Sequence, residues 1–148
     1  MTTPDGAPDG TTYDWYQRAM DLLSRGDASA SLVLLVRVLA EEPDSTAARE
    51  AQARALFDAR RYDEAAEAFA ALVETTPADD FAHYGLGVSL WRLQRFRLAE
   101  DHLAMAAVMR PDRADYRTAL DQVRATLRAR REAGLPLEGP LDPAAGQS

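Results

Sequence analysis

The sequence predicts an all-α protein, a solenoid of three helix-turn-helix repeats followed by a capping helix. The prediction depends on residues that recur at a spacing of 34 along the 148-residue chain. They are Pro43, Pro77 and Pro111; Leu22, Leu56 and Leu90; and Ala19, Ala53 and Gly87. A fixed period near 34 is typical of helical pairs that stack on one another, and about three such repeats are needed to bury a continuous core.

The period divides the chain into a short series of segments. Three repeats are expected over residues 12–45, 46–79 and 80–113, each with two helices and each ended by its proline, which cannot continue a helix. Residues 114–134 are expected to form a capping helix. Residues 1–11 and 135–148 are rich in Pro and Gly without periodicity, so we expect disordered tails.

Turn and cap residues support these boundaries. Gly26 lies between the two helices of the first repeat, where it is a natural helix stop. The second and third repeats have Arg60-Arg61 and Gln94-Arg95 at that place, so a non-glycine residue must close those turns at a small cost. Asp44-Ser45 and Asp79-Asp80 precede new helices and suit N-caps, because their short polar side chains accept from free backbone N–H groups.

The predicted capping helix is amphipathic. Its apolar residues recur at helical spacing, whereas the opposite face is charged and rich in arginine. The apolar set is Tyr116, Leu120, Val123 and Leu127. One apolar and one charged face is what the end of a stacked array requires.

Composition narrows the classes of function. The net charge of −7 and the pI of about 4.8 disfavour binding to nucleic acid or to anionic membranes. There is no cysteine, the N-terminal residues do not resemble a signal peptide, and the apolar runs, such as residues 32–36, are far too short for a membrane span. Lys, Asn and Ile are absent, which favours a GC-rich bacterial gene. We therefore expect a cytoplasmic bacterial protein.

No group of residues predicts chemistry. His83 and His102 are 19 residues apart on different predicted helices, and a packed histidine is the better interpretation of His83. Two histidines without cysteine do not predict a zinc site, and the glycines lack phosphate-loop spacing. We expect no catalytic residue, no metal, no cofactor and no enzymatic activity.

The repeats resemble the tetratricopeptide repeat, whose pattern is W-x-x-L-G-x-x-Y, then A-x-x-x-F-x-x-A, then P. The third repeat matches it with Leu86, Gly87, Ala99, Ala106 and Pro111. The other two repeats follow in register and depart from the apolar pattern at Arg18, Arg49 and Gln52. The resemblance implies a right-handed α-solenoid whose first helices line a concave groove for a partner's peptide or helix.

Mapped by register, that groove is rich in aromatic residues and arginine, the types that most often dominate binding energy. The predicted groove residues are Tyr13, Tyr16, Met20, Leu23, Arg54, Phe57, Phe81, Tyr84, Trp91 and Arg92. The alternative for each is packing between neighbouring helices. Relatives that clamp a chaperone's C-terminal carboxylate use Lys and Asn, which this chain lacks. Arg54 and Arg92 instead favour an acidic-hydrophobic partner segment.

A second candidate surface lies on the second helix of the first repeat. Leu32, Val33 and Val36 stand where the later repeats have alanine or acidic residues. Either a locally rotated repeat buries them or they form a surface for self-association, with a weak homodimer as the result.

The function that these features predict is a protein–protein interaction module, an adaptor or scaffold whose partner the sequence does not identify. Two alternatives remain at this point. One is a structural protein that self-associates through the first repeat, and the other is a secretion-type chaperone for a hydrophobic client.

Overall fold

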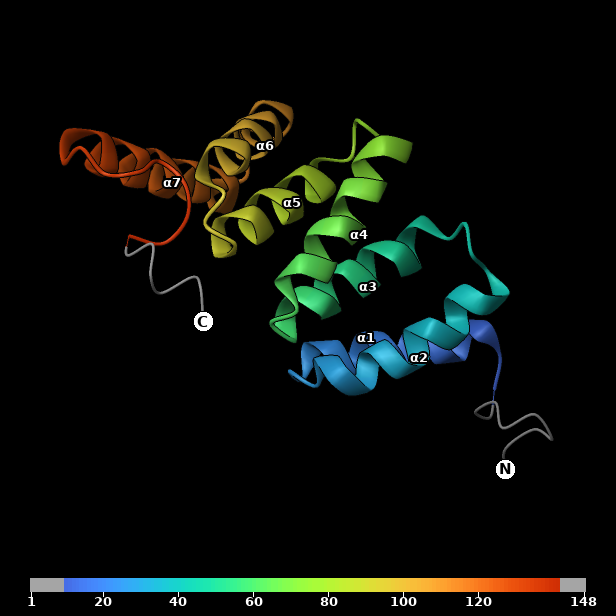
Figure 1. Cartoon of the computed structure of the whole chain (residues 1–148). Helices are drawn as coiled ribbons and strands as arrows, with labels where there is room; N and C mark the ends of the chain where they lie inside the picture. The colour runs from blue at the N-terminus through green and yellow to red at the C-terminus, as the bar shows by residue number, and fades with distance from the viewer. Residues whose placement is uncertain (1–9, 142–148) are drawn as a thin grey trace. The chain divides into compact units, whose positions relative to one another are not determined.

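The computed structural model describes residues 10–141, and these form seven helices without a strand (Figure 1). Residues 1–9 and 142–148, most of the two predicted tails, lie outside the described residues. The prediction of an all-α helical repeat is confirmed. The described chain separates into two compact units, one up to Ala68 and one from Phe69, and α4 (Tyr62–Thr75) runs from the first into the second.

The helix boundaries repeat with the period of the sequence. The first helices of the repeats are α1 (Thr12–Ser24), α3 (Thr46–Asp58) and α5 (Asp80–Arg92). The second helices are α2 (Ala28–Glu41), α4 and α6 (Phe96–Met109), and α7 (Ala114–Glu132) is the predicted capping helix. Each start lies 34 residues after its counterpart, because equivalent caps and turns begin and end each helix.

Three equivalent turns join the paired helices. Gly26, Arg60 and Gln94 all have positive φ, at 84°, 63° and 60°. In each turn the following N–H donates to a leucine carbonyl four residues before the turn residue, as in Asp27 N–H to Leu22 O at 2.9 Å. This geometry closes a helix through a left-handed residue. The expectation that a non-glycine residue closes the second and third turns is confirmed.

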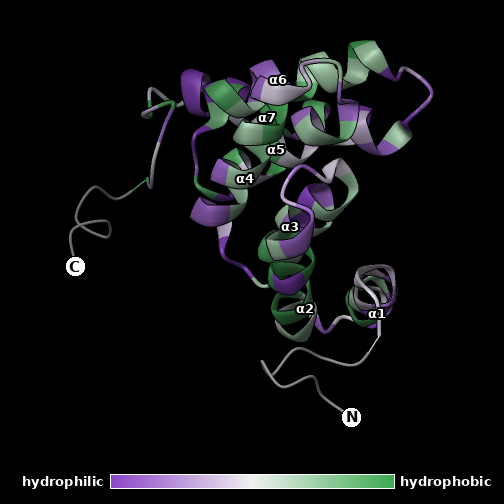
Figure 2. Ribbon diagram, turned by 90° about the vertical axis from the view of Figure 1, so that its right-hand side faces the viewer, coloured by the Kyte–Doolittle hydropathy of each residue, from purple (hydrophilic) through white to green (hydrophobic). Residues whose placement is uncertain are grey.

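In the first unit, α1 packs against α2 and α3, and α2 packs against α3. Trp15, Val38 and Ala48 form a buried cluster at this junction. Ser31 is also buried, and its hydroxyl donates to the carbonyl of Ala19 at 2.8 Å, so its polar group is satisfied. The ribbon of α2 is largely hydrophobic (Figure 2).

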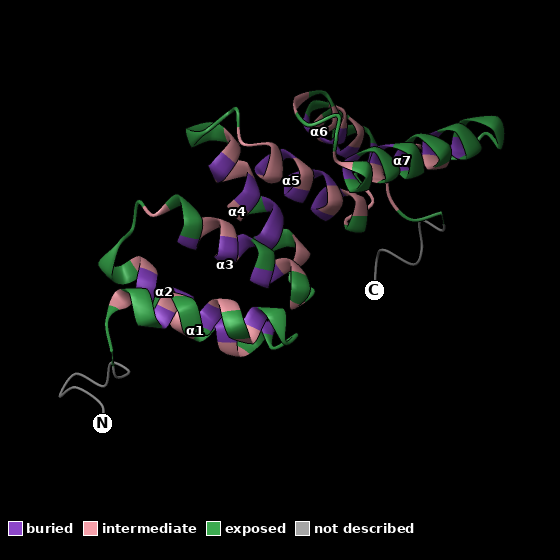
Figure 3. Ribbon diagram, turned by 180° about the vertical axis from the view of Figure 1, so that it is seen from behind, coloured by how far each residue is buried: buried purple, intermediate pink, exposed green. Residues whose placement is uncertain are grey.

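In the second unit, α5, α6 and α7 pack on one another. A Cβ on Gly87 would lie 2.6 Å from Leu103 Cγ, so the small residue of the repeat pattern is required for close approach of α5 and α6. Tyr116, Val123 and Leu127 of α7 are buried, and the arginine-rich side is exposed, apart from Arg130 (Figure 3). The predicted amphipathic character of α7 is therefore observed.

The predicted C-terminal tail begins after the left-handed Gly134. Its described part, residues 135–141, contains no helix, yet it makes backbone and side-chain hydrogen bonds to the second unit. Among the described residues no helix is both long and apolar enough to cross a membrane.

Candidate functional site

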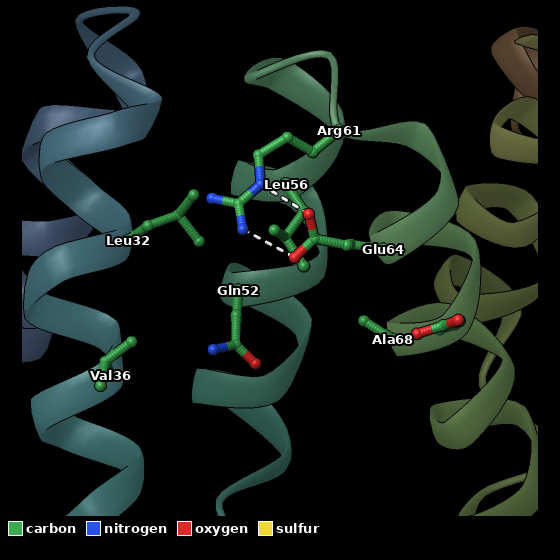
Figure 4. A pocket seen from close by; sticks show the side chains of 8 residues that line it. Leu32, Val36, Gln52, Leu56, Arg61, Glu64 and Ala68 are labelled. Atoms are coloured by element: carbon green, nitrogen blue, oxygen red, sulfur yellow. Dashed lines mark hydrogen bonds and ion pairs between the residues drawn. The ribbon is translucent and has the colours of Figure 1, made fainter.

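A pocket of ≈420 Å³ opens in the first unit between α2, α3 and the first turns of α4 (Figure 4). Its lining is half apolar and half polar. The lining residues are Leu32, Val36, Gln52, Leu56, Arg61, Glu64, Glu67 and Ala68. Gln52, which departs from the apolar repeat pattern, therefore lines this pocket instead of packing in the core.

An ion pair lies at the edge of this pocket. Arg61 Nε and Nη2 donate to the two carboxylate oxygens of Glu64 at 2.9 and 2.6 Å. The hydrogen bond from Arg61 lowers the pKa of the Glu64 carboxyl below its usual value. Both side chains are about half exposed, so the pair contributes little to stability. Its effect is to hold the guanidinium and the carboxylate beside the apolar wall.

The candidate self-association surface divides into a buried and an exposed part. Val33 and Val36 are 68% and 58% exposed, whereas Leu32 is 8% exposed and packs inside the unit. No rotation of the first repeat buries the two valines. Val36 also lines the pocket, so the exposed valine pair is continuous with it.

The predicted groove residues of the first unit differ in exposure. Tyr13 is 68% exposed, Tyr16 and Met20 are half-buried, and Leu23 belongs to the core. On α3, Arg54 Nε lies 3.9 Å from Asp58 Oδ2, and the half-buried Phe57 ring meets the Tyr62 ring edge-on at 5.2 Å.

The aromatic residues predicted for the groove in the second unit all have ring partners there. Phe81 meets Phe69 at 5.8 Å and Trp91 meets Phe96 at 5.2 Å, both edge-on. Tyr84 stacks on Tyr116 of α7 at 4.7 Å. Each of the three nevertheless keeps part of its surface in solvent, and Arg92 is exposed. Inter-helical packing and partial exposure therefore coexist at these positions.

A partly buried hydrogen bond that the sequence did not indicate supports this aromatic stack. Tyr116 is fully buried and its hydroxyl donates to Asp80 Oδ2 at 2.7 Å. Burial first, and then the hydrogen bond to Asp80, raise the pKa of the Tyr116 phenol. The guanidinium of Arg113 lies 4.6 Å from the centre of the same ring. Asp80 is thus more than a helix-start residue, because it anchors α7 to α5.

The two histidines meet in the second unit. Their Nδ1 atoms are 3.2 Å apart, and His83 Nε2 lies 2.9 Å from the carbonyl oxygen of Pro77. His83 is 5% exposed, in agreement with the interpretation of a packed histidine. Within residues 10–141 no three His, Asp or Glu side chains converge as metal ligands would. Sequence reasoning missed the contact between the two rings.

The comparisons with known proteins agree with this architecture. The sequence model of the tetratricopeptide repeat matches residues 16–80 and, in a second overlapping match, residues 51–114. No curated protein sequence matches the chain.

Several solved structures share the fold at low sequence identity. The Sgt2 TPR domain from Aspergillus fumigatus has a TM-score of 0.77 at 16% identity, over 99% of this chain and 94% of that one. MamA from Desulfovibrio magneticus RS-1 has a TM-score of 0.75 at 21% identity, over 84% and 70%. The first TPR of Spaghetti (RPAP3), bound to the HSP90 peptide SRMEEVD, has a TM-score of 0.73 at 13% identity, over 78% and 92%. The matched repeats cover most of the chain, which belongs to the tetratricopeptide-repeat family.

Proposed function

We propose that this chain is a protein–protein interaction module that binds a partner segment on the solvent-facing side chains of its first helices. The observation that carries the proposal is the exposure of Tyr13. This large aromatic residue leaves 68% of its surface in solvent, and Tyr16 and Met20 follow on the same face of α1. Exposed aromatic residues at helical spacing commonly mark binding surfaces.

Arginine supplies the polar part of the proposed surface. Arg54 lies one turn before Phe57 on α3, and its ion pair with Asp58 is long and half exposed, so a partner carboxylate can compete for the guanidinium. The RPAP3 domain holds an acidic peptide on the same fold. By analogy, we propose an acidic-hydrophobic segment as the ligand, with Arg54 as the cation in the first unit in place of the absent lysines.

The test begins with the partner that the tagged chain captures from its native lysate, identified by mass spectrometry and then purified. Tyr13→Ala and Phe57→Ala should each weaken binding of the partner by about 1–2 kcal/mol, because each removes an aromatic side chain that the partner would cover. Val108→Ala is the matched control, because Val108 is 78% exposed on α6, outside the proposed surface. Equal affinities for all three variants would contradict the proposal, provided that circular dichroism shows unchanged helicity.

A second candidate function is self-association through the exposed pair Val33 and Val36. Their exposure beside an open pocket favours it, because contact with a second copy would remove two large apolar side chains from water. Light scattering of the wild type should then give more than the 16.2 kDa of one chain. Val33→Glu combined with Val36→Glu should restore the monomer. A wild type that stays monomeric at high concentration would exclude this second function and leave the first untouched.

A further inference from the structure

Helix α6 begins without a cap of its own. Its N-cap residue, Arg95, makes no side-chain hydrogen bond to the first turn. The residue at the same register in the first repeat is Asp27, whose carboxylate accepts from the N–H of Ala30 at 3.3 Å. The first N–H groups of a helix need partners from outside the helix, so the first turn of α6 depends on another part of the chain.

Glu138 supplies the missing cap from the far end of the chain. Its Oε1 accepts from the backbone N–H of Arg97, the second residue of α6, at 3.0 Å. The carboxylate therefore lies at the positive end of the helix dipole, where a negative charge is stabilised.

A buried arginine holds the backbone on either side of Glu138. Arg130 is only 8% exposed, and its guanidinium lies 4.6 Å from the centre of the Phe96 ring. Its Nη1 donates to the carbonyl oxygens of Pro136 and Gly139 at 3.0 and 2.7 Å. Residues 136–139, the strap, thus curl around one guanidinium.

A fourth hydrogen bond ties the strap to the turn before α6. The N–H of Gly139 donates to the carbonyl of Gln94 at 2.9 Å, and Gly139 has a φ of 76°, which favours glycine. The receiving groups are the Gln94 carbonyl, the Arg97 N–H and the Arg130 guanidinium over Phe96, and we call them the cradle. These groups lie in the turn before α6, in the first turn of α6 and near the end of α7.

The strap is attached by polar contacts rather than by a core. Glu138 is exposed, Leu137 is half-buried, and the leucines that flank the strap, Leu135 and Leu141, are 39% and 57% exposed. A segment held by a few hydrogen bonds with little apolar burial opens locally, without unfolding the helices beneath it.

We propose that the strap is a detachable intramolecular ligand, and that the cradle is a recognition site for a partner's Glu-Gly segment. A helix N-terminus alone would not support this. The Arg97 N–H selects a carboxylate side chain, which Glu138 now provides. The buried Arg130 selects a backbone conformation, because it binds two carbonyl groups at once. The partner segment offers a carboxylate, followed by a glycine that supplies an N–H and a carbonyl in the left-handed conformation. The proposal depends on these contacts and not on the function proposed above.

The strap and the partner segment compete for the same groups. A tethered ligand has an effective concentration in the millimolar range, so a free segment binds weakly until the strap is weakened or the partner is held nearby by a second contact. A partner segment therefore needs a higher concentration to bind the cradle than it would need if the strap were absent.

The test uses the full chain and a synthetic peptide of residues 135–141, Leu-Pro-Leu-Glu-Gly-Pro-Leu, blocked at both ends. The Glu138→Gln variant weakens the strap but leaves the cradle intact. Amide hydrogen exchange by NMR follows two reporters, the N–H of Arg97 in the cradle and the N–H of Gly139 in the strap.

With Glu138→Gln, added peptide should slow exchange at Arg97 and speed exchange at Gly139, because the peptide's carboxylate takes the cap and its backbone displaces the strap. The peptide should bind this variant about tenfold more tightly than it binds the wild type, where the tethered carboxylate competes. A control peptide with Gln in place of Glu should bind at least about tenfold more weakly, because the charge-assisted hydrogen bond is lost.

Gly139→Ala is the second variant, because it strains the strap at positive φ without changing the cradle. It replaces Glu138→Gln if that variant loses helicity. Unchanged exchange at both amides in the folded variant, with peptide in the millimolar range, would overturn the proposal and make the strap a fixed structural element. Equal binding of the Glu and Gln peptides would overturn it as well.

Discussion

His83 and His102 share one hydrogen bond between their Nδ1 atoms, at 3.2 Å. The Pro77 carbonyl can only accept, so His83 Nε2 carries a proton and donates to it at 2.9 Å. The neutral His83 ring must then accept at Nδ1, and His102 Nδ1–H donates. This assignment follows from the hydrogen-bond network. It gives each ring a fixed tautomer and makes the pair sensitive to protonation.

The first prediction is a loss of stability as the pH falls below about 6.5. Burial lowers the pKa of His102, the neighbouring His83 lowers it further, and Asp101 opposes these effects. Below the unfolded-state pKa the unfolded chain therefore binds more protons than the folded chain, so the free energy of unfolding decreases until His102 is protonated in the folded state. Urea unfolding at pH 8, 7, 6 and 5 measures the decrease.

His102→Gln is the control for this prediction, because glutamine can donate to His83 but does not titrate. The variant should lose the part of the pH dependence that begins below about pH 6.5 and ends when His102 is protonated in the folded chain. Only a small loss of stability should remain at lower pH from Glu64 and Asp115, whose pKa values are lowered by exposed arginine partners. Identical slopes for wild type and variant in the upper window would show that the histidine pair is not the cause.

A second prediction concerns the left-handed residue Arg60, whose φ is 63°. Glycine reaches this conformation without the steric cost that other residues have there, so Arg60→Gly should stabilise the protein by about 0.5–1 kcal/mol. The neighbouring Ala59 has a φ of −80° and is the matched control, and Ala59→Gly should destabilise by a similar amount. Equal losses in urea unfolding for both variants would disprove a strain at Arg60.

The period of the sequence was sufficient to predict the helices. Equivalent prolines, caps and turns recur every 34 residues, and the helix starts at Thr12, Thr46 and Asp80 follow them with the same spacing. Local signals were reliable here because the turns that join paired helices are closed by hydrogen bonds between residues close in sequence, such as Arg95 N–H to the Leu90 carbonyl. The contacts between Arg130 and the strap could not be predicted in this way, because they have no periodic counterpart in the sequence.

The candidate sites were predicted less completely, because they depend on contacts between helices. The contact of His83 with His102 joins the two helices of the third repeat, but the two residues lie 11 and 8 positions from Gln94 in the turn, so sequence spacing alone does not pair them. Periodicity alone does not say which member of an apolar run faces outward. It grouped Leu32 with Val33, although one is 8% and the other 68% exposed.

The third prediction separates these two residues. Leu32→Ala should destabilise the first unit by about 2 kcal/mol or more, because it removes buried methyl groups and enlarges the adjacent pocket. Val33→Ala should change the free energy of unfolding by no more than about 0.5 kcal/mol, as exposed substitutions do. Urea unfolding at low protein concentration measures both values without a contribution from self-association. A large loss for Val33→Ala would mean that this valine is buried in solution.

The fourth prediction compares the two stacked tyrosines. Tyr116→Phe removes a buried hydroxyl that donates to Asp80 at 2.7 Å, and it should destabilise the second unit by about 1.5–3 kcal/mol, the usual contribution of a hydrogen bond to a charged group. Tyr84→Phe keeps the stack at 4.7 Å and should be nearly neutral, because the Tyr84 hydroxyl makes no hydrogen bond within residues 10–141. The difference between the free energies of unfolding of the two variants measures the contribution of the Tyr116 hydroxyl, because both variants preserve the aromatic contact.

Asp80→Asn should reproduce the loss only in part, since an amide oxygen still accepts from the phenol but carries no charge. Equal stabilities for Tyr116→Phe and Tyr84→Phe would show that α7 is held to α5 by ring packing alone.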